Sequence, residues 1–318
     1  MNDTFEILGI LKNYKGRDVQ VILPDVVSVI NDGAFENSDV KVVDLRSVKE
    51  IKANAFKNCK SLEKVILKDV EVIENDAFLG CDDLRTVEYL GSLQNWCEID
   101  FKCFTANPLY YAKNLFIDGE QIKELTLDLK TVKNYAFCGL CIDELTLLNV
   151  QEIGVGAFSD CKGFKDLVLP STLKKVGELA FRGSSMETLT IHKDLSVESW
   201  AFFNCLSLKK VIFQAKMQDW LNLRFRDVWA NPLSYANALY VDGEKINVLS
   251  IPQGVKVIPQ ACFAGLDVKK VILNDASIIE DVAFYGCKNL ENIVDVPEKI
   301  GDSAFAECPK LDKTIFEK

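Results

Sequence analysis

Residues 51–67 read IKANAFKNCKSLEKVIL, and this stretch contains every position of a unit that recurs along the chain. An apolar residue stands four positions before an Ala-Phe pair, and a cysteine follows the Phe three positions later. An apolar-x-x-apolar-x-apolar run, Leu62-x-x-Val65-x-Leu67, completes the unit. The Ala-Phe half occurs in nine copies, and in a tenth Cys262 replaces Ala. The ten copies are Ile30–Phe35, Ile51–Phe56, Ile73–Phe78, Val132–Phe137, Ile153–Phe158, Val176–Phe181, Val197–Phe202, Ile258–Phe263, Ile279–Phe284 and Ile300–Phe305.

The period predicts a repeat solenoid. Most neighbouring Phe residues of the copies are 21, 22 or 23 positions apart. A unit of that length cannot bury its apolar face alone, whereas stacked units share one continuous core. The alternating run after each cysteine indicates a short strand with its apolar side inward. We therefore expect about 13 short strands, lying parallel along one face of a single domain over 1–318, with a lead-in segment at 1–18.

Two longer units interrupt the period, at 90–124 and 214–248. They match each other at an offset of 124 residues, as in Trp96 and Trp220 or Asn107-Pro108 and Asn231-Pro232. Asp118-Gly119 and Asp242-Gly243 stand between apolar runs and predict hairpin turns. Ser92–Cys97 and Pro108–Ala112 are predicted to be short helices. The chain thus also carries a larger repeat, in which several short units precede a long one.

Composition narrows the classes of function. The 318 residues are 48% hydrophobic and carry a net charge of −10, which excludes a disordered chain. An acidic chain repels phosphate, so we expect neither a nucleic-acid partner nor binding to an anionic membrane. No apolar run approaches the ~18 residues that a membrane helix needs, so no membrane insertion is expected.

The sequence predicts no catalytic, metal or cofactor site. The single histidine, His192, is expected to point from its strand to solvent, and no nucleophile turn accompanies it. Most of the 11 cysteines occupy repeat positions and are interpreted as small buried hydrophobes. Cys138-x-x-Cys141 lacks the second pair that a zinc site needs. Whether Cys97 and Cys103, or Cys138 and Cys141, form disulfides stays open.

Two surfaces are candidates for binding. Two residues of each strand should point away from the core, and their charges vary along the array. The candidates on this strand face are Lys64, Glu124, Glu144, Asp166, Thr188 and Lys210. The long units add two groups of aromatic residues, which either anchor the longer loops or bind a partner. Trp229 and Tyr111 are their candidates for the surface.

The unit resembles the BspA-like class of leucine-rich repeats, found in many bacteria and some protists. The resemblance implies an α/β fold, a right-handed superhelix with few short helices. It also implies protein binding: adhesion to a host or matrix protein, or to another cell's surface protein. The class motif contains no catalytic residue. Ordinary leucine-rich repeats keep an Asn after the strand, whereas Val48, Val70 and Val150 occupy that place here.

We therefore expect a non-enzymatic protein-binding scaffold, an adhesin or another interaction protein that presents its strand face. Two alternatives are a structural spacer within a larger cell-surface protein and an intracellular interaction scaffold. The resemblance suggests the cell surface or secretion, but this chain shows neither a signal peptide nor an anchor, so the cytoplasm stays open. A final strand is expected at Leu311–Phe316 without a polar cap, which leaves end-to-end self-association open.

Overall fold

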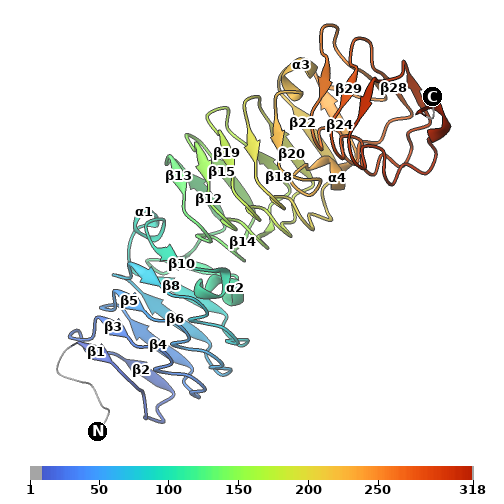
Figure 1. The fold of residues 1–318 in the computed structure, drawn as a ribbon. Coiled ribbons are helices and arrows are strands. Elements are labelled where there is room, and N and C mark those ends of the chain that lie inside the picture. The colour runs from blue at the N-terminus through green and yellow to red at the C-terminus, as the bar shows by residue number, and fades with distance from the viewer. Residues whose placement is uncertain (1–8, 317–318) are drawn as a thin grey trace. The chain divides into compact units, whose positions relative to one another are not determined.

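The computed structural model describes residues 9–316 and shows a solenoid of about 13 turns (Figure 1). This confirms the predicted repeat fold with parallel strands and few helices. Its contacts form two compact units. The first unit comprises the described residues up to Leu125 with Val132–Asp143 and Gly154–Lys162, and the second comprises Thr126–Thr131, Glu144–Ile153 and the described residues from Gly163 onward. One continuous domain over 1–318 stays a prediction.

The first unit has two rows of parallel strands. The predicted row contains β2 (Gln20–Ile22), β4 (Val42–Leu45), β6 (Lys64–Leu67), β8 (Thr86–Tyr89) and β10 (Leu115–Ile117). The strand β11 (Glu120–Gln121) turns back on β10 through Asp118-Gly119, which confirms that hairpin. The second row contains β1 (Ile10–Leu11), β3 (Val29–Ile30), β5 (Glu50–Ile51), β7 (Val72–Ile73) and β9 (Asp100–Phe101). This row of two-residue strands, at the apolar position before Ala-Phe, was not predicted.

The second unit repeats both rows. Its predicted row contains β15 (Glu144–Leu147), β18 (Asp166–Val168), β20 (Thr188–Ile191), β22 (Lys210–Phe213), β24 (Leu239–Val241), β26 (Val248–Ser250), β28 (Lys270–Ile272) and β30 (Asn292–Val294), and β25 (Glu244–Lys245) closes the second hairpin. Its other row contains β16 (Glu152–Ile153), β19 (Lys175–Val176), β21 (Ser196–Val197), β23 (Arg224–Phe225), β27 (Val257–Ile258), β29 (Ile278–Ile279) and β31 (Lys299–Ile300). The remaining strands are β12 (Glu124–Leu127), β13 (Thr131–Val132), β14 (Cys141–Ile142) and β17 (Lys162–Gly163).

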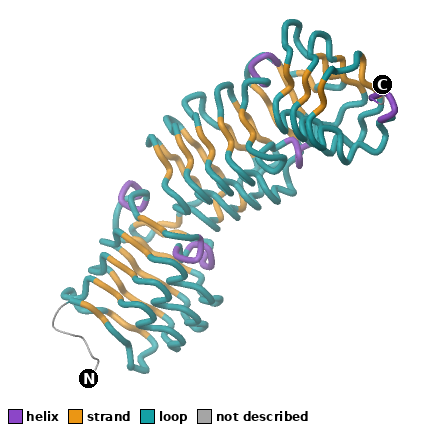
Figure 2. The backbone as a smooth tube through the Cα atoms, in the orientation of Figure 1, coloured by secondary structure: helices purple, strands orange, loops and turns teal. Residues whose placement is uncertain are grey.

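The helices are single turns in the long units (Figure 2). They are α1 (Leu93–Trp96), α2 (Leu109–Ala112), α3 (Met217–Trp220) and α4 (Leu233–Ala236), with the 3₁₀ turn η1 (Phe104–Ala106). The prediction of helices at 92–97 and 108–112 is thus confirmed. The predicted final strand is wrong, because the 3₁₀ helix η2 (Lys313–Phe316) stands there. The Asp312 carboxylate accepts the Thr314 N–H at 3.0 Å and its hydroxyl at 2.7 Å, which favours a turn over an extended chain.

Stacked rings and a ladder of thiols form the core. The Phe rings of successive coils stack, as in Phe56 on Phe78 with centroids 5.1 Å apart and Phe181 on Phe202 at 5.6 Å. The repeat cysteines are buried as predicted, and they also donate a hydrogen bond. Each bonds the Phe carbonyl of the preceding coil, as Cys59 Sγ does to Phe35 O at 2.9 Å. These carbonyls also accept a backbone N–H of their own coil, as Phe35 O does from Ser38 at 2.9 Å, so the thiol adds a second hydrogen bond that an apolar residue of similar size cannot make.

Each coil turns through two left-handed residues. In all ten copies the residue before Ala, or before Cys262, has a positive φ, and so does the second residue after Phe. The later position holds Asn, Asp or Gly in every copy except Glu307, in keeping with their tolerance of this region. The earlier position also holds unfavourable residues such as Trp200 (φ 58°) and Val282 (φ 52°).

Candidate functional site

The long units are anchored by buried side chains that bond to the next coil. Trp220 is fully buried, and its Nε1 donates to Cys262 O at 3.0 Å. Asn231, also fully buried, donates through Nδ2 to Ala261 O at 2.8 Å and to Cys262 O at 2.9 Å, and its Oδ1 accepts the Leu233 N–H at 2.9 Å. Trp96 and Asn107 make the matching bonds in the first unit. Trp96 and Trp220 therefore hold the fold together.

Tyr111 also has a structural role. It is half-buried on α2, and its hydroxyl accepts the Gly80 N–H at 2.9 Å. Tyr235 stands 124 positions later and bonds in the same way to the backbone of Asn204. Burial raises the pKa of both phenols. A further role of Tyr111 in binding stays a prediction.

An aromatic cluster lies on the second unit, and it includes the predicted Trp229. The cluster is defined by Trp200, Phe203, Trp229 and Tyr235. Trp200 is 48% exposed and Phe203 39% exposed, and the neighbouring Leu206 is 76% exposed. The half-buried Trp229 lies edge-on to Phe203, with centroids 6.0 Å apart, and 6.1 Å from Tyr235. The Asp227 carboxylate accepts the N–H groups of Trp229 at 2.9 Å and of Trp200 at 3.5 Å, which links the two tryptophans.

The first unit does not require these side chains at the same positions. Asp76, Leu79, Asp82 and Thr105 stand 124 positions before Trp200, Phe203, Leu206 and Trp229. The coil therefore folds with polar residues at three of the four places. The sequence analysis identified Trp229 but missed Trp200, Phe203 and Leu206. The signal for them was available, because their residues differ from those 124 positions earlier.

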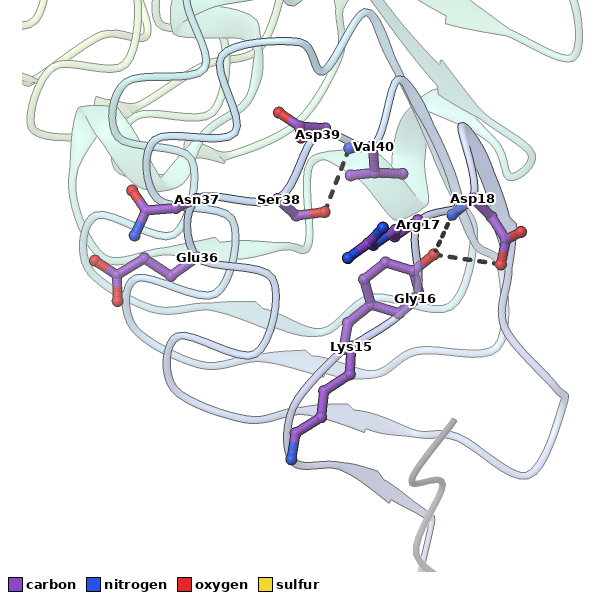
Figure 3. A pocket seen from close by; sticks show the side chains of 10 residues that line it. Lys15, Gly16, Arg17, Asp18, Glu36, Asn37, Ser38, Asp39 and Val40 are labelled. Carbon is purple, nitrogen blue, oxygen red and sulfur yellow. Dashed lines mark hydrogen bonds between the residues drawn. The ribbon is translucent and has the colours of Figure 1, made fainter. Parts of the chain in front are cut away.

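A pocket of about 260 Å³ adjoins the cluster. Trp229 and Tyr285 contribute its aromatic lining, and Lys288 and Glu307 its charges. In the first unit, a pocket of about 590 Å³ is lined by Lys15, Arg17 and acidic residues (Figure 3). There the Tyr14 hydroxyl accepts the Asp18 N–H at 3.1 Å, and its ring stacks on Phe35 at 4.8 Å.

The strand-face candidates lie in both units. In the first, Glu124 is exposed, and Lys64 is half-buried and ion-paired with Glu88. In the second, Glu144 is exposed and accepts a hydrogen bond from the Thr146 hydroxyl.

Asp166, Thr188 and Lys210 align on the neighbouring strands β18, β20 and β22, as expected for one outward column. The Lys210 Nζ lies 4.3 Å above the Tyr240 ring. Two other positions expected to face outward are buried instead, Asp44 (3% exposed) beside Arg46 and Thr190 (6% exposed). The binding role of the candidates stays a prediction.

The remaining polar candidates offer no catalytic arrangement. His192 is half-buried, less exposed than predicted, and burial lowers its pKa. All 11 cysteines are reduced thiols, so neither Cys97 and Cys103 nor Cys138 and Cys141 are bridged. Burial raises the pKa of Cys97 to about 12. Within residues 9–316, no three His, Cys, Asp or Glu side chains group as a metal site would need, and no helix is long and apolar enough to cross a membrane.

A family model described as "BspA type Leucine rich repeat region", in six copies, matches residues 17–110, 130–230 and 235–318. The chain belongs to the BspA-type leucine-rich repeat family. A comparison with curated proteins found no match.

Two solved structures are similar to this BspA-type chain. One is a leucine-rich cell surface protein from Faecalibacterium prausnitzii, 18% identical with a TM-score of 0.49, over 95% of this chain and 76% of that one. The other is a leucine-rich repeat protein from Bacteroides ovatus, 21% identical with a TM-score of 0.48, over 95% of this chain and 88% of that one. Membership of this repeat family suggests a role in protein interaction.

Proposed function

We propose that this BspA-type chain is a non-enzymatic scaffold that binds a protein ligand, and that the aromatic cluster of the second unit contacts this ligand. The supporting observations are the exposure of Trp200, Phe203 and Leu206 and the contact of the Phe203 ring with Trp229. The backbone N–H groups of Trp200 and Trp229 share the Asp227 carboxylate. Single exposed apolar residues are ordinary, but a group of them marks an interaction site. Tryptophan is enriched among the residues that dominate binding energies.

The left-handed backbone of Trp200 supports this assignment. Its φ of 58° is unfavourable for a bulky residue, and strained conformations concentrate at functional sites. The matching residue of the first unit, Asp76, suits the same conformation better. Trp200 therefore costs stability at a place where the fold accepts a cheaper residue, as Val282 does in another coil. We attribute to ligand binding the combination of this cost with an exposed ring.

The proposal includes an adhesin or other interaction protein with a host, matrix or cell-surface ligand. The packed coils of the second unit offer a pre-formed surface, so little conformational entropy is lost on binding. A passive spacer is the rival function, and it predicts no selective ligand.

The test replaces the cluster by the residues of the first unit. The variant carries Trp200→Asp, Leu206→Asp and Trp229→Thr, all of which the first unit tolerates. Wild-type protein and variant are compared by quantitative affinity capture from host-cell and matrix extracts. Purified ligands are then titrated by calorimetry.

We expect at least one ligand to be lost with the variant and kept with the control Leu148→Asp, which changes another exposed apolar residue of the second unit (47% exposed). Equal binding by all three proteins would remove the cluster from the proposed function. The absence of any saturable ligand would favour the spacer.

A further inference from the structure

The pocket of about 260 Å³ beside the aromatic cluster is lined by three parts of the second unit. Trp229 and Ser234 come from the long unit, where Ser234 belongs to α4. Tyr285 and Lys288 come from a later short coil, and Glu307 comes from the last one. The pocket is smaller than the about 300–1,000 Å³ of pockets for drug-sized ligands, so its occupant is one small group of a larger ligand.

Small or engaged side chains keep this space open. The Ser234 hydroxyl donates to Val228 O. The Asn237 amide donates to Gly265 O at 2.9 Å. Both polar groups are thus bonded to the backbone. Gly286 has a φ of 70°, and a Cβ added there would meet no atom within 4 Å, so an empty volume remains beside it.

The first unit has different side chains at these places. Tyr110, on α2, stands 124 positions before Ser234. The Lys113 Nζ lies 4.9 Å from the centre of the Tyr110 ring and donates to the Tyr110 carbonyl, so these two residues engage each other. Tyr285 directly follows the Phe of the second short copy after its long unit, and the buried Ser159 holds that place in the first unit. The fold therefore requires neither the small Ser234 nor the ring of Tyr285.

Four polar groups of the lining side chains have no partner in the described part of the chain. They are the Trp229 indole N–H, the Tyr285 hydroxyl, the Lys288 ammonium and the Glu307 carboxylate. No buried side-chain nitrogen or oxygen of a described residue lacks a partner, so these four groups face solvent. The lining thus offers both hydrogen-bond donors and acceptors to a ligand.

The charges of the lining favour a neutral occupant. Lys288 and Glu307 have opposite charges, so the pocket gives no net preference for a cation or an anion. A purely apolar group would cover the polar groups without bonding them, which costs free energy. A pyranose ring avoids both costs. Its C–H groups pack on the negative face of an aromatic ring, and its hydroxyls form charge-assisted hydrogen bonds with ammonium and carboxylate groups.

We infer that the pocket binds a single neutral pyranose ring, the terminal sugar of a glycan that the ligand carries. Trp229 and Tyr285 supply the rings on which the sugar packs, and Lys288 and Glu307 bond its hydroxyls. The inference rests on the proposed function, because Trp229 also belongs to the aromatic cluster. The sugar alone can nevertheless be titrated without the protein that carries it.

The test is saturation-transfer NMR on the full chain, with methyl glycosides of glucose, galactose and N-acetylglucosamine as neutral probes. The glycosides of glucuronic acid and glucosamine add one negative or one positive charge to such a ring. N-acetyltyrosinamide represents an aromatic side chain of a protein. The variant Ser234→Tyr with Asn237→Lys introduces the residues of the first unit and should fill the pocket, and Tyr285→Ser removes one ring.

Two controls separate the pocket from its surroundings, and circular dichroism checks that every variant is folded. Ser171→Tyr with Asn247→Lys makes the same two changes at exposed positions of the second unit outside the pocket. Trp200→Asp with Leu206→Asp changes the exposed apolar residues but none that lines the pocket. A failure of the proposed function therefore shows in the protein ligand, and a failure of this inference shows in the sugar.

We expect at least one neutral glycoside to bind the wild type and both controls with a dissociation constant of about 1 mM, in keeping with so small a ligand. The two pocket variants should weaken this binding about fivefold or more, and each charged glycoside should bind more weakly than the tightest neutral one. No saturable binding of any neutral glycoside, or equal binding by the pocket variants, would overturn the site. A charged glycoside that binds as tightly as the tightest neutral one would overturn the neutral occupant. Binding of N-acetyltyrosinamide alone would assign the pocket to an aromatic side chain of the ligand instead.

Discussion

Asn231 offers the sharpest test of how the long units are joined to the coils that follow them. The change Asn231→Ala removes three buried hydrogen bonds, to Ala261 O, Cys262 O and the Leu233 N–H. Both carbonyls keep another donor, because the Ala264 N–H bonds Ala261 O at 3.2 Å and Trp220 Nε1 bonds Cys262 O at 3.0 Å. The Leu233 N–H loses its acceptor. At about 1 kcal/mol for each bond, the free energy of unfolding should fall by about 3 kcal/mol.

The assay is urea unfolding followed by circular dichroism, with hydrogen exchange to locate the loss. Coils of a solenoid contact only their neighbours, so the change weakens one junction of the array. Protection should therefore fall most in α4 and in residues 261–266. The control is Asn247→Ala, because the exposed Asn247 donates only to Lys245 O, at 3.3 Å. It should change stability by less than about 0.5 kcal/mol.

An isosteric change separates the hydrogen bonds from packing. Asn231→Asp keeps the acceptor for Leu233 but places carboxylate oxygen against two carbonyl oxygens. Burial and these oxygens raise the pKa of the new acid above its unfolded value of about 3.9. The variant is therefore least stable at neutral pH and recovers as pH falls towards about 4. The reasoning is refuted if Asn231→Ala costs less than about 1 kcal/mol, or if the Asp variant is insensitive to pH.

Three further outcomes follow from the structure. Val282→Asn should raise the free energy of unfolding in urea by about 1 kcal/mol, because a β-branched residue at φ 52° is strained. A lower urea concentration at the unfolding midpoint would contradict this. An aromatic disulfide reagent at pH 8 should react rapidly with at most two thiols of the native protein, the half-buried Cys103 and Cys141, and with all 11 thiols in urea. The reason is that burial raises thiol pKa values, that of Cys59 to about 12. Rapid reaction of more than two thiols would show that the column of repeat cysteines opens in the native protein. Changing the exposed Glu124, Glu144 and Asp166 to Lys should leave the thermal unfolding midpoint within a few degrees of the wild type. The same change should weaken the binding of a ligand that uses the strand face. Unchanged affinity for an identified ligand would exclude that face as its binding site.

The periodic parts of the fold were predictable from the sequence for a physical reason. Phe56 has a Phe counterpart in each of the ten copies, and Cys59 has a Cys counterpart in five of the other nine, so one unit shows where the core positions of the others lie. The row from β1 to β9 escaped prediction because a two-residue strand is too short to show alternation. The predicted last strand was wrong because the Asp312 carboxylate bonds the Thr314 N–H and hydroxyl, and this local contact favours a turn.

The surface was harder to predict, because its side chains depend on neighbours from other coils. Lys64 looked available for a ligand, but Glu88, on the adjacent strand, pairs with it. Asp44 stands at an outward position and is nevertheless buried beside Arg46. Trp200 stands at the repeat position that forms the turn before Ala-Phe. The repeat pattern does not show whether a side chain at that position is exposed, and only the structure did so.

Comparison of the first and second units at the offset of 124 residues separates the side chains that the fold requires from those that a partner can use. Trp220, Asn231 and Tyr235 have identical counterparts in the first unit, and all of them bond to backbone atoms. The aromatic cluster lies where the two units differ. At the place of Trp200 the first unit has Asp76, which suits a left-handed backbone better. The repeat therefore does not require a tryptophan at position 200, and the proposal that the aromatic cluster binds a ligand rests on this difference.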